Sequence, residues 1–110
     1  MTEGIYQINF AGSAGEGTGV LVLTNGRIVG TDAGGVDYDG TYQANALSTD
    51  ASIRCTVRPG TELVTGVPAQ SQAYSFDINA TVPPGGSGVT IVKTPFGDVR
   101  VNIRYLRSLQ

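Results

Sequence analysis

The chain has 110 residues, the size of a single domain (residues 1–110), and contains 16 glycines, 5 prolines and no histidine. Abundant Val, Ile, Thr and Tyr favour strands joined by tight turns over helices, so we expect an all-β fold. The net charge of −2 indicates no basic surface for nucleic acid, and no segment approaches the roughly 20 apolar residues that cross a membrane. We expect neither a nucleic-acid nor a membrane partner.

Four strands are expected in the first part of the chain, at residues 4–10, 16–23, 27–31 and 36–44. Residues 4–10 alternate cleanly and place Tyr6, Ile8 and Phe10 on one face, as in a half-buried strand. Asn25-Gly26 predicts a two-residue type I′ hairpin, because both residue types tolerate the positive φ that this turn needs twice.

Gly40 lies between Tyr38 and Tyr42, which share its strand face. A glycine at such a position predicts a strand that is bent or closely approached by a neighbour.

Four further strands are expected at residues 51–58, 73–82, 89–93 and 99–106. Residues 59–72 form the longest irregular connection, with a single helical turn expected near residues 61–64. The total is eight short strands with mostly hairpin-length connections. This pattern favours an antiparallel, up-and-down barrel over a sandwich.

The interior of an eight-stranded barrel is either filled by its own side chains or holds one small ligand. Six aromatic residues on the expected inward faces are the candidates for ligand binding: Tyr6, Phe10, Tyr38, Tyr42, Tyr74 and Phe76. The tyrosine hydroxyls, or Arg54 if it points inward, would orient the ligand. For a barrel this narrow we favour the alternative, a core filled by these side chains.

Little in the sequence suggests catalysis. The absence of histidine removes the commonest general base and metal ligand. Asp37 and Asp39 share a strand face and could bind a cation, but no third ligand lies nearby, so a solvated face explains them better. Cys55 is expected to be buried and inert, because its neighbours in the strand point to the opposite face. We expect a protein without enzymatic activity, cofactor or metal.

The single cysteine also bears on localisation. Cys55 cannot form an internal disulfide, so the sequence does not indicate an oxidising compartment. The first residues lack the apolar core of a secretion signal. We therefore expect a cytoplasmic protein.

Short motifs follow one another in a fixed order along residues 4–42: Gly4-Ile5-Tyr6 with Ile8 and Phe10, Gly17-x-Gly19, Asn25-Gly26, Gly30-x-Asp32 and Tyr38-x-Gly40-x-Tyr42. Their order and spacing resemble the Grl-type family of negative regulators of type III secretion. The resemblance covers approximately residues 1–45. It implies a small lipocalin-like barrel with an apolar cavity, usually dimeric, that acts by protein contact.

In that family an acidic run after the Tyr-x-Gly strand contacts a transcription activator. The matching turn here, residues 47–51, has one acid, Asp50, which is the candidate for partner binding. The sequence thus predicts a non-catalytic regulatory or interaction protein. A carrier of a small apolar or lipid ligand is the alternative.

One strand breaks the alternation that a monomeric barrel needs. In residues 16–23, Val20 and Val22 oppose Leu21 and Leu23, so one aliphatic pair must point outward. Residues 89–93 repeat this pattern. We expect a homodimer that covers outward aliphatics, unless residues 59–72 fold over them. The interface candidates are Leu21, Leu23 and Val92.

Overall fold

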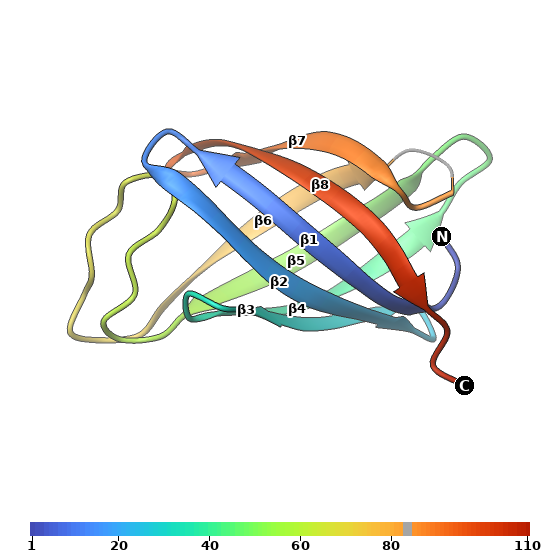
Figure 1. Ribbon diagram of the computed structural model, residues 1–110, viewed down its shortest axis with the longest axis horizontal. Coiled ribbons are helices and arrows are strands. Elements are labelled where there is room, and N and C mark those ends of the chain that lie inside the picture. The colour runs from blue at the N-terminus through green and yellow to red at the C-terminus, as the bar shows by residue number, and fades with distance from the viewer. Residues whose placement is uncertain (83–84) are drawn as a thin grey trace.

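The structure is a computed structural model that describes residues 1–82 and 85–110. Within these residues it contains eight strands: β1 (Gly4–Gly12), β2 (Gly15–Thr24), β3 (Arg27–Asp32), β4 (Val36–Ala44), β5 (Thr49–Val57), β6 (Tyr74–Val82), β7 (Gly88–Thr94) and β8 (Gly97–Arg107). They pair antiparallel in the order β6-β5-β4-β3-β2-β1-β8-β7 and curl into a nearly closed barrel (Figure 1). The predicted all-β, eight-stranded, up-and-down barrel is confirmed.

The strand limits differ from the expected ones mainly at the ends of strands. β4 coincides with the expected range, whereas β1 and β8 extend further. β5 begins at Thr49 rather than at residue 51, because the alternation of buried side chains continues back to Thr49. Thr49 is a buried polar residue, and its hydroxyl oxygen accepts a hydrogen bond of 3.2 Å from the Met1 ammonium.

The hairpin between β2 and β3 has the predicted turn. Asn25 and Gly26 have φ values of 50° and 77°, as a type I′ turn requires at both central positions. The helical turn expected near residues 61–64 is wrong. The chain there makes a tight turn instead, in which the Gly66 N–H donates to the Leu63 carbonyl at 2.9 Å.

Gly40 is closely approached by a neighbouring strand, as predicted. It pairs with Ile53 of β5, and a Cβ atom on Gly40 would collide with the Ser52 carbonyl oxygen and lie 2.9 Å from the Ile53 Cα. The absence of a side chain therefore lets β4 and β5 lie together at this point.

In residues 1–82 and 85–110, backbone pairing closes the barrel at every junction except the one between β6 and β7, which we call the seam. Among the described residues the seam is bridged by side chains. The Thr90 hydroxyl donates to the Thr81 carbonyl at 2.9 Å. Toward the other end, the Phe96 ring packs edge-on against Phe76, with ring centroids 5.2 Å apart, and against Tyr74.

The two ends of the barrel are built differently. Both chain termini lie at one end, at the right of Figure 1, and the long connection between β5 and β6 lies at the other. No helix in the described residues has the length and apolarity needed to cross a bilayer.

Candidate ligand cavity

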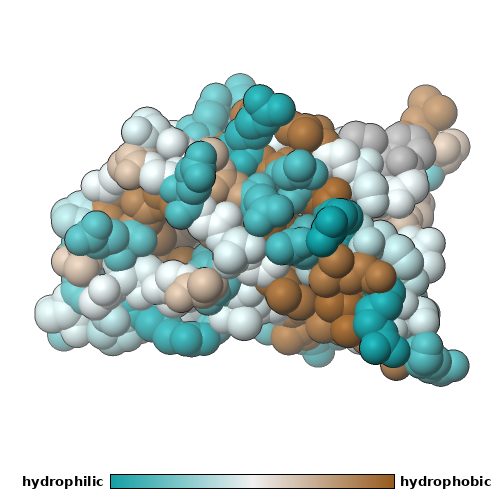
Figure 2. Space-filling view, viewed as in Figure 1, coloured by the Kyte–Doolittle hydropathy of each residue, from teal (hydrophilic) through white to brown (hydrophobic). Residues whose placement is uncertain are grey.

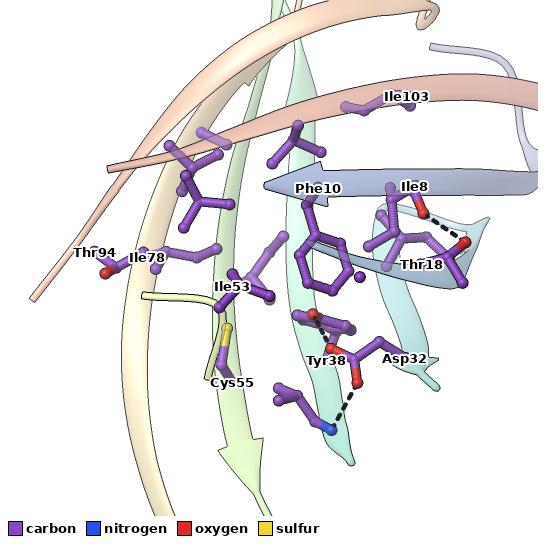
Figure 3. Close-up of a pocket in the computed structure, with 18 of the residues that line it drawn as sticks. Ile8, Phe10, Thr18, Asp32, Tyr38, Ile53, Cys55, Ile78, Thr94 and Ile103 are labelled. Carbon is purple, nitrogen blue, oxygen red and sulfur yellow. Dashed lines mark hydrogen bonds between the residues drawn. The ribbon is translucent and has the colours of Figure 1, made fainter. Parts of the chain in front are cut away.

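A cavity of about 490 Å³ lies inside the barrel, within the range typical of small-molecule sites. Aliphatic and aromatic side chains from several strands form most of its wall and face one another in Figure 3: Ile8, Phe10, Ile53, Ile78 and Ile103 among them. The filled core that we favoured is therefore wrong for the middle of the barrel. Small inward residues, such as Ala51, Cys55 and Ala80, leave this volume unfilled.

The cavity has an apolar end and a polar end. Leu23, Ala51 and Val82 line it near the chain termini. Most of the polar lining comes from the start of β2, the end of β3 and the long connection, all at the opposite end of the barrel: Glu16, Thr18, Asp32, Thr61, Glu62 and Thr65. Thr90 and Thr94 of β7 add two further hydroxyls. The cavity is thus amphipathic along the barrel axis.

Asp32 is a buried polar group at that end with several hydrogen bonds. It ends β3 and is only 8% exposed. Its Oδ1 accepts hydrogen bonds from the backbone N–H groups of Gly34, Gly35 and Val36 at 3.0, 2.9 and 3.0 Å, which organises the turn into β4. Its Oδ2 accepts from the Tyr38 hydroxyl at 2.7 Å (Figure 3). Four donors thus compensate the burial of this carboxylate.

Tyr38 reaches into the cavity from β4 and supports Asp32. Burial, followed by the hydrogen bond to Asp32, raises the pKa of the Tyr38 hydroxyl. The hydroxyl therefore stays protonated and acts as a donor. Its position fixes the Asp32 carboxylate against the cavity wall.

The long connection covers the polar end of the barrel. Its backbone is tied to the β1–β2 hairpin, where the Ala14 N–H donates to the Val64 carbonyl at 2.8 Å. The buried Thr61 and the partly buried Leu63 line the cavity beneath it. The connection therefore closes an end of the barrel and leaves Val20, on the outer face of β2, 42% exposed. The alternative that residues 59–72 cover this face is wrong.

The six aromatic ligand candidates lie in three different places: the cavity wall, the core and the seam. Phe10, Tyr38 and Phe76 line the cavity. Tyr6 and Tyr42 pack into the core instead, and the fully buried Tyr6 ring meets Tyr105 edge-on at a centroid distance of 5.3 Å. Tyr74 packs against Phe96 at the seam. Sharing an inward face thus did not ensure contact with the cavity.

Sequence reasoning missed the polar lining from turns and loops, above all Asp32, Thr61 and Thr65. Strand periodicity assigns inward positions only within strands, and two of these residues lie outside any strand. The signal for Asp32 was available, because an Asp followed by Ala33-Gly34-Gly35 favours a turn capped by its own side chain.

The charged residues weighed for catalysis or ligand orientation lie on the outer face. Arg54 pairs with Asp77 at 3.0 Å and does not line the cavity. Hydrogen bonds from Arg58, then from Thr31, lower the pKa of Asp37. Asp39 is exposed. In the described part of the chain, no three His, Cys, Asp or Glu side chains are grouped to hold a metal ion.

Cys55 is buried and lines the cavity. Burial, with smaller contributions from the negative charges of Asp32 and Asp77, raises the pKa of its thiol to about 12. A protonated, buried thiol is a poor nucleophile, so this environment does not activate Cys55.

The dimer candidates Leu21, Leu23 and Val92 are wrong as interface residues. Their side chains are buried and line the cavity. The register with β1 decides this, because Leu21 pairs with the buried Tyr6 and therefore shares its inward face. The outward pair of β2 is Val20 and Val22.

Asp50, the candidate for partner binding, lies in β5 and not in a turn. Its carboxylate is exposed and accepts hydrogen bonds from the Asn45 amide at 2.6 Å and the Thr81 hydroxyl at 3.2 Å. The β4–β5 turn is confined to residues 45–48, where Leu47 is 81% exposed.

Comparison of the chain with protein-family models finds no match, and comparison with curated proteins finds no significant one.

Proposed function

We propose that the protein binds a small apolar molecule inside its barrel. The observation that carries this proposal is the cavity of about 490 Å³ with its predominantly aliphatic and aromatic wall. A ligand there would gain roughly 25 cal/mol for each Å² of apolar surface removed from water. Asp32, Tyr38 and Thr65 at one end would orient it.

The test enlarges side chains that line the cavity, so that they fill it, instead of truncating them. Ala51→Leu with Ala80→Leu adds bulk at the apolar end, where both side chains line the cavity. We expect the wild type to take up the neutral dye Nile red and the variant to lose most of this binding while staying folded. Ala44→Leu, on an exposed residue, is the matched control. Failure of the wild type to bind dye or any co-purified small molecule, by fluorescence and native mass spectrometry, would refute the proposal.

A second function is favoured by a separate observation, an apolar strip on the outer face of β1, β2 and β3. Ile5, Val22 and Val29 lie side by side across these strands, and Val20 extends the strip along β2. Val20 and Val29 are 42% and 45% exposed. Figure 2 shows an apolar area at the lower right, where the ends of β8, β1 and β2 lie in Figure 1. We infer that this strip contacts a protein, first of all a second copy of the chain.

The resemblance to the Grl-type regulators leads to the same class of function. It adds the expectation of a cytoplasmic protein that restrains type III secretion by binding a transcription regulator, with Asp50 as the contact residue. Affinity purification from the source cell tests this prediction. A partner recovered with the wild type and lost with Asp50→Lys would support it, and recovery of none above background would count against it.

A further inference from the structure

We propose that the cavity selects amphiphiles with a positively charged head group over those with a carboxylate. This inference rests on the proposed ligand binding and concerns its chemistry. Three acids line the polar end of the cavity, the buried Asp32 and the solvent-exposed Glu16 and Glu62, and we call them the acidic mouth. Among the described residues that line the cavity none is Lys or Arg, and the Met1 ammonium lies at the opposite end beside Thr49.

The arrangement of the lining fixes how an amphiphile would lie. The opposite end is formed by the side chains of Leu23, Ala51 and Val82, which offer a hydrocarbon tail apolar contact, together with Met1, whose ammonium donates to the Thr49 hydroxyl. A tail placed there leaves its head among the acidic mouth and the hydroxyls of Thr18 and Thr61. The long axis of the cavity therefore orders tail and head in one direction.

At the polar end of the cavity, Asp32 and Thr65 can each form a further hydrogen bond with a ligand. Asp32 Oδ1 is saturated by three backbone N–H donors, but Oδ2 accepts only one hydrogen bond, from Tyr38. A carboxylate oxygen can accept two, so Oδ2 can take a further donor from a head group. The Thr65 Oγ1 atom also lines this end, and it is buried without a hydrogen-bond partner in the described structure. Buried polar atoms of this kind usually have a partner, which here a ligand would supply.

Charge decides which head group fits. An ammonium head would be attracted by the three acids of the mouth, most strongly by Asp32, which is buried, and less by Glu16 and Glu62, whose charges are screened by solvent. A carboxylate would meet three like charges there. The Met1 ammonium is at the other end of the barrel beside Thr49, and Arg54 and Arg58 are paired with Asp77 and Asp37 on the outside. None of these cations would compensate a carboxylate at the mouth.

Within the described residues the acids of the mouth form no group close enough to hold a metal ion. Their shared effect is therefore a negative potential at the head-group position.

The experiment compares three probes of equal chain length and different charge. Dodecylamine, dodecanol and dodecanoate are each titrated, below their micellar concentrations, into wild-type protein that carries Nile red at pH 7. The displacement of the dye gives the affinity for each probe. We expect dodecylamine to bind about tenfold or more tighter than dodecanoate, with dodecanol between them. If Nile red does not bind at all, the proposed function fails. If it binds and dodecanoate competes as well as dodecylamine, only the charge selection fails.

Variants that remove the charges of the acidic mouth test whether these charges cause the selectivity. Glu16→Gln, Asp32→Asn and Glu62→Gln together should bring the affinities for the amine and the carboxylate to within about threefold while the affinity for dodecanol stays unchanged. Because Asp32 organises the β3–β4 turn, the double variant Glu16→Gln, Glu62→Gln is measured as well, and it should lower the ratio partway without touching the turn.

A matched control makes the same change in net charge elsewhere. Glu3→Gln, Asp77→Asn and Asp98→Asn alter three exposed acids that do not line the cavity. This variant should keep the wild-type preference for the amine. Equal loss of preference in the control and the mouth variants would overturn the proposal, because overall charge would then explain it.

Discussion

Gly40 is a single residue on which the fit of two strands depends. A methyl group at this position would lie against the backbone of Ser52 and Ile53, which cannot move without disturbing β5. We expect Gly40→Ala to lower the free energy of unfolding by about 1 to 3 kcal/mol, as overpacking typically does. Urea denaturation followed by tyrosine fluorescence measures the change.

The control for Gly40→Ala is Gly15→Ala, also in a strand. A Cβ atom on Gly15 meets no other atom within 4 Å, so this change should leave stability within about 0.5 kcal/mol of the wild type. Equal effects at the two sites would mean that the contact at Gly40 does not limit the packing of β4 and β5.

Cys55 gives a second prediction for one side chain. Its pKa of about 12, against an ordinary value of 9.0, leaves about a thousandth of the usual thiolate fraction near neutral pH, and burial blocks access as well. Labelling by iodoacetamide at pH 8 should therefore be far slower in native protein than in protein unfolded in guanidinium chloride. Equal labelling rates would show that the thiol is reached by solvent and is not held protonated by the fold.

The seam between β6 and β7 is the element on which closure of the barrel depends. The described residues show no backbone pairing there, and Phe96 contributes contacts to Phe76 and Tyr74. Phe96→Ala should lower stability by about 1 kcal/mol, the size of an aromatic pair interaction. It should also speed hydrogen exchange of β6 and β7 amides more than that of β2 amides, because the seam loses the ring contacts of Phe96 with Tyr74 and Phe76.

Leu47→Ala is the control for the seam, because Leu47 is largely exposed in the β4–β5 turn. Its effect on stability should stay within about 0.5 kcal/mol. Unchanged exchange of β6 and β7 amides in Phe96→Ala would show that the seam is held by other contacts.

The elements themselves could be predicted from the sequence because local rules determine them. Asn25-Gly26 specifies a turn, and residues 4–10 specify an inward and an outward face. In β2 both faces are aliphatic, so periodicity says which residues lie together but not which pair turns inward. The register of Leu21 opposite Tyr6 decides this, and register depends on both strands.

At the scale of the whole molecule, the sequence predicted closure of the barrel but not its hollow interior. A cavity is the difference between the volume enclosed by eight strands and the volume of all inward side chains, and no single motif encodes it. Its polar end could not be foreseen for a related reason. Thr61 and Thr65 reach it from an irregular connection, whose path over the barrel follows from tertiary packing.

The apolar strip on β1, β2 and β3 leads to the prediction for the assembled molecule. The strip is bordered by Arg107 of β8, which pairs with Ile5, on one side and by Asp39 of β4, which pairs with Val29, on the other. A two-fold axis running along the strands would bring Arg107 of one protomer to Asp39 of its partner and bury both strips together. The surface is therefore complementary to itself in charge as well as in hydrophobicity.

We expect the protein to form a homodimer with twice the 11.4 kDa mass of one chain. The double variant Val20→Lys, Val22→Lys should convert this dimer into a folded monomer, because it places two charges in the apolar strip. Light scattering and circular dichroism measure mass and fold. Val89→Lys with Ile91→Lys is the control, because these residues are also exposed outward aliphatics but lie on β7, beyond the arginines of β8. It should remain dimeric. Wild-type protein that scatters as a monomer at high micromolar concentration would exclude the dimer, and dissociation of the β7 control alone would place the interface on the other side of β8.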